Sequence, residues 1–404
     1  MILWIFLHIV LASLPTESLT DSFEGIDCSL TENRCTVHYP APKQSLTALK
    51  SIMVKNEIDR LEVHSEIPIG GLLLLLQDLR YLKELDLSNA VIDANVPGFL
   101  SERSHRLHAL TSLKLKFDMD NQYFASLSAL LKTLPGMKLN YLEFIAVRFT
   151  ASGLQELVNY IGDRLHKFTI QQTDLNDSMQ YLCKIISQSP NLKSFNAPLN
   201  DMRDHQFADI IACIKRFQGS LVSVDVSGNK LTDLQSFSKE FESSGIQTLV
   251  LSENLLSVDG INELSQIFKK QNQLKKLFLQ NCRLSDCIGQ RLFKSFLYDA
   301  EVNLVTLDLG GNCLETSYYA LKYLIQRDCK IQSLYLDNNL LSNSDLVQFF
   351  KHFRDQNFKK LKQLDLRNNK FNSSTILEFL KLLDTYNYNN VEILFDADSV
   401  QHWE

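Results

Sequence analysis

The feature that most constrains the fold of this chain is a pattern of leucines repeated along the sequence. It is clearest in the stretch LVTLDLGGNCL, from Leu304 to Leu314, in which apolar residues occupy the first, fourth, sixth and eleventh positions and an asparagine the ninth. Similar stretches begin at Ile246, Leu274, Ile331 and Leu361, so the intervals between first positions are 28, 30, 27 and 30 residues. A unit of this length cannot bury its apolar side chains alone, so neighbouring copies must stack into a solenoid.

The pattern is regular from Leu221 onward and weaker before it. The less regular strand signals begin at Ile58, Leu82, Leu110, Leu139, Leu165 and Leu192, and a degenerate last strand is predicted over residues 391–395. Between strands, apolar residues recur at the spacing of an amphipathic helix. Helices are therefore predicted over residues 153–161, 179–186, 207–217, 261–268, 318–325, 346–353 and 376–383.

The spacing L-x-x-L-x-L-x-x-N-x-L is the signature of a leucine-rich repeat. A repeat that holds both a strand and a true α-helix needs about 28 residues, at the long end of the range for this motif. We therefore predict an α/β leucine-rich repeat solenoid in the form of a horseshoe. Parallel strands should line its concave face and α-helices its convex face.

The repeats resemble the ribonuclease-inhibitor-like subfamily of leucine-rich repeat proteins. The resemblance covers roughly Ile58 to Phe395 and is specific from Leu221 onward, and Cys282 in the asparagine column is a substitution that this subfamily permits. The subfamily includes inhibitors of secreted ribonucleases, GTPase activators for Ran, and the repeat domains of tropomodulin and of actin capping-protein regulators. The resemblance implies a scaffold that binds other proteins through its concave face and the loops at the strand ends.

The leucines and the asparagine column are interpreted as scaffold. Each buried leucine contributes about 1.5–3 kcal/mol, and an asparagine where the chain leaves the sheet can satisfy backbone groups of the turn. In the regular half this column reads Asn229, Asn254, Cys282, Asn312, Asn339 and Asn369. In the first half it holds Ala90, Asp118, Val147 and Thr173, so the early repeats should be less regular.

The N-terminus predicts a secreted chain. Residues 2–14 are nearly all apolar, too short a run to span a bilayer but the right length for the core of a signal peptide. The alternatives are a wrongly assigned start or a buried helix. The predicted organisation is a signal peptide over residues 1–20, an N-terminal cap over 21–57, repeats over 58–390 that become regular from 221, and a degenerate C-terminal strand and tail over 391–404.

In a secreted chain, cysteines can form disulfides and sequons can be glycosylated. Cys28 and Cys35 bracket a polar segment of the cap, and in a secreted chain they would form a disulfide; in the cytosol they would be two free thiols. The six cysteines within the repeats are interpreted as small buried hydrophobes. Asn176 and Asn372 lie in N-x-S sequons and are candidate glycosylation sites.

The candidate binding surface lies at the variable positions of the motif. Successive strand residues alternate between faces, so the third, fifth and seventh positions should face solvent on the concave side. At the fifth position Val250, Phe278 and Tyr335 are notable, because an apolar side chain exposed on a strand face marks a binding surface and aromatic residues are enriched at binding hot spots. With their flanking charges they form a predicted protein-binding patch, which consists of Val250, Lys276, Phe278, Asp308, Tyr335, Asp337, Asp365 and Arg367.

These observations predict a non-catalytic, secreted or cell-surface binding protein. The net charge of −6 and the pI near 5.9 argue against nucleic acid as a partner. Motifs for nucleotide binding, zinc proteolysis or a nucleophilic serine do not occur, and we expect no enzymatic activity, no cofactor and no metal. We expect a monomer without a membrane span that binds another protein. The alternative is a cytoplasmic regulator of actin assembly or of a small GTPase.

Overall fold

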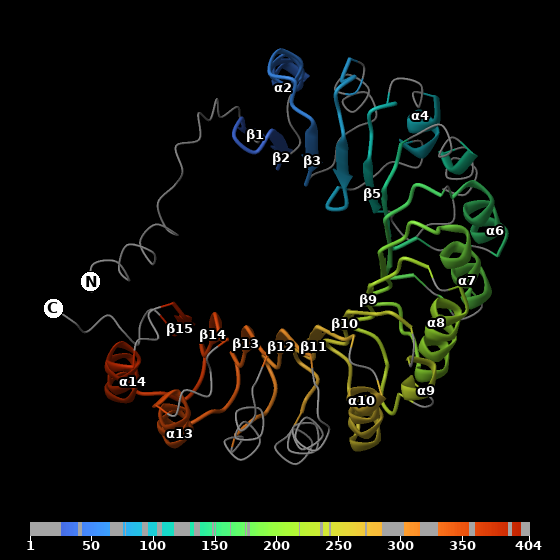
Figure 1. Ribbon diagram of the computed structural model, residues 1–404. Helices are drawn as coiled ribbons and strands as arrows, with labels where there is room; N and C mark the ends of the chain where they lie inside the picture. The colour runs from blue at the N-terminus through green and yellow to red at the C-terminus, as the bar shows by residue number, and fades with distance from the viewer. Residues whose placement is uncertain are drawn as a thin grey trace. The chain divides into compact units, whose positions relative to one another are not determined.

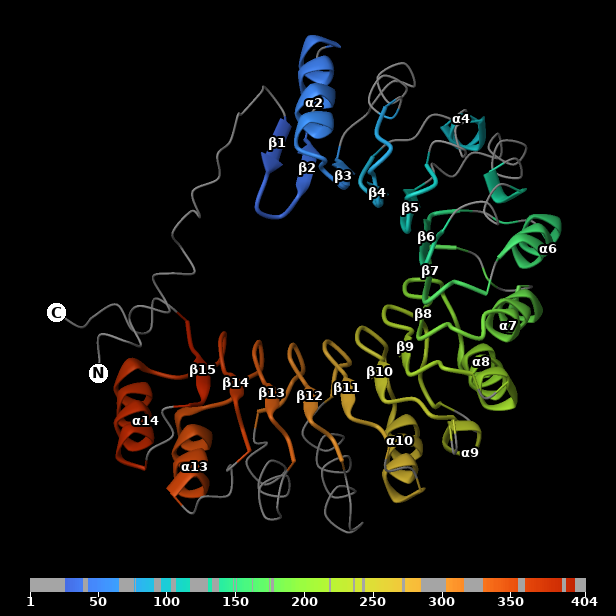
Figure 2. The ribbon, with the colours of Figure 1, turned by 45° about the horizontal axis from the view of Figure 1, so that its top comes forward.

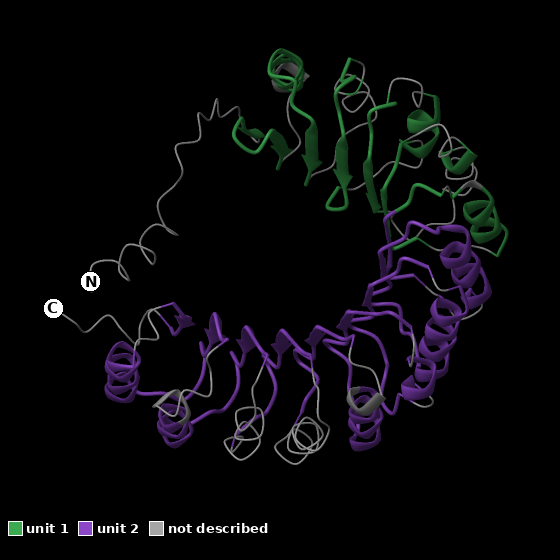
Figure 3. Ribbon diagram, viewed as in Figure 1, with its two compact units in different colours: residues 1–165 green, residues 166–404 purple. Residues whose placement is uncertain are grey.

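The computed structural model (Figures 1 and 2) describes residues 26–38, 43–64, 76, 78–90, 96–102, 107–116, 130–132, 138–147, 149, 151–161, 163–173, 175, 178–217, 219–234, 237–241, 244–270, 273–284, 303–315, 330–354, 360–386 and 390–396. They belong to two compact units, residues 1–165 (unit 1) and 166–404 (unit 2), which are coloured green and purple in Figure 3. The predicted signal peptide and Asn176 lie outside the described residues.

Unit 1 begins with an antiparallel hairpin of β1 (Ile26–Ser29) and β2 (Arg34–Val37). From β2 onward the strands pair in parallel and in chain order, through β3 (Arg60–Val63), β4 (Glu84–Leu87), β5 (Ser112–Lys116) and β6 (Tyr141–Ile145). Its helices include α2 (Lys43–Lys55), α4 (Val96–Glu102) and α6 (Ala151–Tyr160). The cap thus supplies strands of its own to the sheet, ahead of the first strand signal in the sequence at Ile58.

Unit 2 continues the strand–helix alternation. Its strands are β7 (Lys167–Gln171), β8 (Ser194–Asn196), β9 (Ser223–Asp225), β10 (Thr248–Val250), β11 (Lys276–Phe278), β12 (Thr306–Asp308), β13 (Ser333–Tyr335), β14 (Gln363–Asp365) and β15 (Glu392–Leu394), and neighbours in this order pair in parallel. The helices among its described residues are α7 (Met179–Gln188), α8 (Asp204–Phe217), α9 (Phe237–Phe241), α10 (Val258–Lys270), α13 (Asn343–Arg354) and α14 (Ser373–Thr385). They lie on one side of the strand layer (Figure 2).

The burial of the strand residues follows the motif. In the repeat of β11, Leu277 and Leu279 at the fourth and sixth positions are buried, whereas Lys276 is exposed and Phe278 half-buried. The leucines therefore point toward the helices, and the third, fifth and seventh positions form the opposite surface, here called the strand face. The predicted class, an α/β leucine-rich repeat solenoid with parallel strands and α-helices in separate layers, is confirmed.

Most predicted helices begin and end within a few residues of the observed ones, although residues 318–325 lie outside the described residues. Several helices begin before their first apolar residue because polar residues cap or form their first turns. In α14, for example, the side chain of Asn372 accepts a hydrogen bond from the backbone N–H of Thr375 at 2.9 Å. None of the helices that the structure describes is long and apolar enough to cross a membrane.

The asparagine column joins each repeat to the one before it. Asn254 is fully buried; its Oδ1 accepts from the N–H of Leu231 at 3.0 Å, and its Nδ2 donates to the carbonyls of Val226 at 3.0 Å and Leu251 at 2.9 Å. One amide side chain thus satisfies backbone groups of two consecutive repeats. Asn229, Asn312, Asn339 and Asn369 make the same kind of contacts.

The column of buried, hydrogen-bonded asparagines, here called the ladder, starts one repeat before the regular half of the sequence. Asn200 occupies the ninth position of the copy that begins at Leu192, is buried, accepts from the N–H of Thr173 at 2.6 Å and donates to the carbonyl of Ile170 at 2.8 Å. At Cys282 a thiol replaces the amide and donates to the carbonyl of Leu251 at 3.3 Å. Burial raises the pKa of the Cys282 thiol to about 12, so it remains a protonated donor at neutral pH.

Disulfides occur in both units. Cys28 and Cys35 lie directly opposite each other in the β1–β2 hairpin and are bonded. Cys183 of α7 and Cys213 of α8 form a second disulfide between helices of consecutive repeats. The interpretation of the repeat cysteines as buried hydrophobes is correct for Cys282 but wrong for Cys183, Cys213 and the exposed Cys313, and Cys287 and Cys329 lie outside the described residues. For Cys183 and Cys213 it fails because helical periodicity does not reveal which side chains of adjacent helices meet.

We predict that Asn254→Ala lowers the free energy of unfolding by about 3 kcal/mol, since it leaves several buried backbone groups without a partner. Urea denaturation of the intact chain measures the loss. The control is Asn369→Ala, near the end of the ladder and half-exposed, where water can replace the amide and the loss should be less than half as large. Equal losses in the two variants would contradict the role assigned to the buried ladder.

We also predict that iodoacetamide at pH 8, without reductant, modifies Cys313 but not Cys282. Cys313 is exposed, whereas Cys282 is buried and its pKa near 12 leaves almost no thiolate, the reactive form. Peptide mapping by mass spectrometry identifies the labelled residues. Cys28, Cys35, Cys183 and Cys213 should react only after reduction and unfolding, and labelling of any of these four before reduction would contradict the observed pairing.

Candidate functional site

In unit 2 the predicted binding residues lie in neighbouring strands of one sheet. Val250 of β10 pairs with Phe278 of β11, Phe278 with Asp308 of β12, and Asp308 with Tyr335 of β13. Tyr335 in turn pairs with Asp365 of β14, the last strand that contributes to the predicted patch. Adjacent strands lie about 4.8 Å apart, so neighbouring side chains of such a row are within contact range. The register thus brings the fifth-position residues of the predicted patch into one line.

The aromatic side chains of this row are half-buried, less open to solvent than the sequence indicates. The hydroxyl of Tyr335 donates to Oε1 of Gln363, a third-position residue of β14, at 2.7 Å. That bond holds the ring of Tyr335 on the strand face and turns its hydroxyl toward β14. Gln363 is a contributor that the sequence analysis missed, because its position alone does not distinguish it from other polar strand residues.

The expectation that every fifth position is open to solvent is wrong at Asp365, which is only 2% exposed. The guanidinium of Arg367 covers its carboxylate, with Nε at 3.0 Å from Oδ1 and a terminal nitrogen at 2.6 Å from Oδ2. This bidentate pair neutralises Asp365 within the protein. Asp365 and part of Arg367 are therefore less available to a partner than the rest of the patch.

Asp308 has a different environment. Its Oδ1 accepts from the N–H of Gly310 at 2.9 Å, and among the described residues no side chain donates to its carboxylate. Burial raises the pKa of Asp308; the Gly310 amide opposes that shift, and the negative charges of Asp337 and Asp365 raise the pKa further. The carboxylate is thus held by the fold in an environment that disfavours its charge.

Gly310 explains how two carboxylates come close together here. A Cβ atom at this glycine would lie 2.7 Å from Oδ1 of Asp337, so the Asp337 side chain occupies space that any other residue would fill. The other carboxylate oxygen of Asp337 accepts from Nδ2 of Asn338 at 2.6 Å. Lys276, two residues before Phe278, is exposed and makes no ion pair with the described residues.

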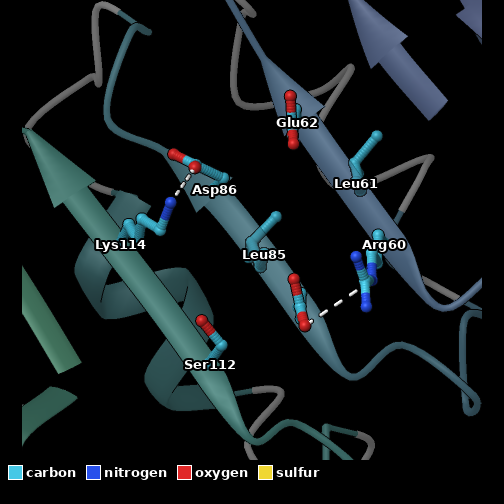
Figure 4. A pocket seen from close by; sticks show the side chains of 8 residues that line it. Arg60, Leu61, Glu62, Leu85, Asp86, Ser112 and Lys114 are labelled. Carbon is cyan, nitrogen blue, oxygen red and sulfur yellow. Dashed lines mark hydrogen bonds and ion pairs between the residues drawn. The ribbon is translucent and has the colours of Figure 1, made fainter. Parts of the chain in front are cut away.

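The strand face of unit 1 carries charges that pair with one another. Nζ of Lys114 in β5 lies 2.6 Å from Asp86 in β4, Arg60 in β3 lies 3.6 Å from Glu84, and Arg34 lies 3.3 Å from Glu62. Figure 4 shows Lys114 pointing at Asp86, and Arg60 reaching across to β4, around a shallow hollow. The hollow leaves about 30 Å³ of space, enough for a water molecule but far below the several hundred Å³ of typical ligand pockets.

The pairing shifts the titration of both partners. Burial alone would raise the pKa of Asp86, but hydrogen bonds from Lys114 and Ser88 outweigh it and hold that pKa below its usual value. Burial would lower the pKa of Lys114, but its contact with Asp86 and the charges of Glu143 and Glu62 raise it. Both groups are therefore ionised over a wider pH range than in the unfolded chain, and the surface satisfies its own charges.

Among the described residues, no group of histidine, cysteine, aspartate and glutamate side chains could hold a metal ion. The sequon residue Asn372 is exposed at the start of α14, where its Oδ1 accepts hydrogen bonds from Thr375 and Ser374.

We predict that Asp86→Asn lowers stability at neutral pH and has little effect in acid. The pKa of Asp86 is lower in the folded state, so its contribution is present above the unfolded value near 3.8 and is lost as pH falls through the folded pKa. Urea denaturation of both proteins between pH 7 and pH 3 measures the difference. Glu84→Gln, which breaks an exposed pair, should change stability by less than about 1 kcal/mol at any pH. A difference for Asp86→Asn that does not shrink in acid would contradict the assignment.

Comparisons with known proteins agree with the repeat architecture. A family model described as Leucine Rich Repeat matches residues 360–383. NACHT, LRR and PYD domains-containing protein 13 of Homo sapiens is 28% identical over 166 residues, which cover 38% of this chain. The same alignment covers 15% of the relative, so the chain spans a small part of that protein's length.

Solved structures also match this chain, at low sequence identity. The Rad7–Elc1 complex of yeast contains a chain with a TM-score of 0.51 and 16% identity, and the match covers 90% of this chain and 87% of that one. An internalin, inlF, of Listeria monocytogenes gives a TM-score of 0.37 and 18% identity over 97% and 94% of the two chains. The repeated motif, the strand–helix units and the family match over residues 360–383 together show a leucine-rich repeat fold.

Proposed function

We propose that this protein is a non-catalytic scaffold, secreted or exposed at the cell surface, that binds another protein through the strand face of unit 2. The observation that carries this proposal is the row in which Phe278 and Tyr335 remain partly open to solvent beside Asp308. Leucine-rich repeat domains generally act as protein-binding scaffolds, with extended surfaces formed by their stacked repeats. The binding residues proposed here are Val250, Lys276, Phe278, Asp308, Tyr335, Asp337, Asp365 and Arg367.

The aromatic residues of the strand face lie outside the apolar core, which the leucines form. The leucines on the other side of the strands, such as Leu277 and Leu334, are essentially fully buried and supply the apolar core. Aromatic rings on the strand face add less to folding because part of their surface stays in water. Covering that surface with a partner would remove it from water, and aromatic residues are enriched among the residues that dominate binding energy.

Secretion is supported by the cysteines. Two disulfides among the described residues, Cys28–Cys35 and Cys183–Cys213, are typical of an oxidising compartment. The apolar run at residues 2–14 would then act as a signal peptide, and the exposed Asn372 would be accessible to glycosylation. Asn176 is proposed as a second acceptor on its sequon alone.

The alternative is a cytoplasmic, ribonuclease-inhibitor-like regulator of actin assembly or of a small GTPase. The strand-plus-helix repeats with intervals of 27 to 30 residues favour that subfamily. N-terminal sequencing of the mature chain and a thiol count without reductant distinguish the two locations. An intact Met1 together with free Cys28 and Cys35 would exclude the secreted form.

We predict that Phe278→Ala combined with Tyr335→Ala abolishes capture of the partner. The purified chain is used as bait, the captured protein is identified by mass spectrometry, and its affinity is then measured by calorimetry. Because both rings are half-buried, the double variant should lose only about 1–2 kcal/mol of folding stability.

The matched control truncates aromatic residues on the helix layer. Phe217 and Tyr386 are 44% and 37% exposed, at the ends of α8 and α14, and their joint replacement by alanine should leave capture unchanged. Unchanged affinity of the Phe278/Tyr335 variant, or equal loss in the control, would reject the strand face as the binding surface.

A further inference from the structure

We propose that the row Phe278–Asp308–Tyr335 is a subsite for a basic side chain, preferentially an arginine, presented by a protein partner. This inference rests on the proposed function and specifies the chemistry of the partner. Asp308 stands between the two aromatic residues in strand register, with β11 on one side and β13 on the other. Its carboxylate has different hydrogen-bond partners from the equivalent carboxylates of other repeats.

Aspartate occurs at the fifth position of several repeats, and each of four accepts a hydrogen bond from the backbone N–H two residues later. For Asp86, Asp225, Asp308 and Asp365 those distances are 2.9, 2.9, 2.9 and 3.1 Å. This bond belongs to the turn of the motif and is common to all four. The remaining acceptor sites of each carboxylate require other hydrogen-bond donors.

In three of the four repeats the protein itself supplies a side-chain donor. The hydroxyl of Ser227 donates to Asp225 at 2.7 Å, and Arg367 forms a bidentate pair with Asp365. Asp86 receives both the hydroxyl of Ser88 and the ammonium of Lys114. At Asp308 the seventh-position residue is Gly310, which has no side chain to donate.

The described side chains around Asp308 supply neither a hydrogen-bond donor nor a positive charge to its carboxylate. The hydroxyl of Tyr335 donates its hydrogen bond to Gln363 and therefore not to Asp308. Asp337 lies across Gly310 and contributes a second negative charge. Lys276 on β11 makes no ion pair with any described carboxylate.

A cation at Asp308 could interact with the carboxylate and with both aromatic rings of the row. A guanidinium can form two parallel hydrogen bonds with a carboxylate, and its planar faces are attracted to aromatic rings. Phe278 and Tyr335 supply such rings on the adjacent strands, and Asp337 supplies further negative potential. No described residue places a cation at Asp308, so this partly desolvated carboxylate gains more from an external cation than the paired carboxylates of Asp365 or Asp86.

The test uses peptides selected for binding to the full chain from a randomised display library. Peptides that depend on the strand face are those that lose binding to the Phe278→Ala/Tyr335→Ala variant. We expect these peptides to share an arginine. Synthetic copies are then made with that arginine replaced by citrulline, which keeps the shape of the side chain and removes its charge.

Citrulline should weaken binding to the wild-type chain at least tenfold and should change binding to Asp308→Asn by less than twofold. Asp308→Asn keeps an acceptor for the N–H of Gly310, and circular dichroism checks that it folds. Asp225→Asn, the equivalent change in a repeat whose aspartate has a serine partner, should leave the citrulline effect at its wild-type size.

The outcomes separate the two proposals. Peptides that depend on Phe278 and Tyr335 but share no basic residue, or whose citrulline effect persists in Asp308→Asn, would overturn the subsite and leave the strand face as a binding surface. A selection that yields no peptide dependent on those two aromatic residues would overturn both the subsite and the proposed binding surface.

Discussion

The hydrogen bonds between each buried asparagine and the backbone of two consecutive repeats are the interaction on which the regular half of this structure depends. Where the chain leaves each strand, several backbone groups lie within the protein and away from water. Asn254 satisfies three of them at 3.0 Å or less, two in the preceding repeat and one in its own. Leucines alone would bury those groups without a partner, at a cost of about 1–3 kcal/mol each.

Because the ladder and the leucines stabilise the solenoid, the third, fifth and seventh positions are free to vary. The two units use that freedom differently. On the strand face of unit 1, cations and carboxylates of neighbouring strands pair with each other, as Lys114 does with Asp86. On the strand face of unit 2, Asp308 lies between two aromatic residues, and within the described part of the chain its carboxylate has only a backbone donor. An unpaired charge beside partly exposed apolar surface is a better candidate for recognition than a charge that is already neutralised.

The cysteines show how one residue type serves several physical roles in the same repeats. Cys282 replaces an asparagine of the ladder and acts as a buried donor, whereas Cys183 and Cys213 join helices of consecutive repeats. A disulfide between neighbouring repeats restricts the unfolded chain over a 30-residue separation. The position of each cysteine within the repeat, on the turn or on the helix, decides which of these roles it takes.

The sequence by itself determined the repeat, the parallel strands, the positions of most helices and the line of fifth-position residues. Repeats of about 28 residues bury their leucines when they stack with equivalent positions side by side, so each column of the motif becomes a line across the sheet. Asn200 could also have been found, since it occupies the ninth position of its copy. Only the tertiary structure decided which charges are neutralised. Arg367 covers Asp365, whereas Gly310 offers Asp308 no side-chain donor of the kind that Ser227 gives Asp225. These differences depend on contacts between side chains, within a turn and across neighbouring strands. A one-dimensional pattern gives the column in which a side chain stands, but not the direction in which it turns or the neighbour it meets.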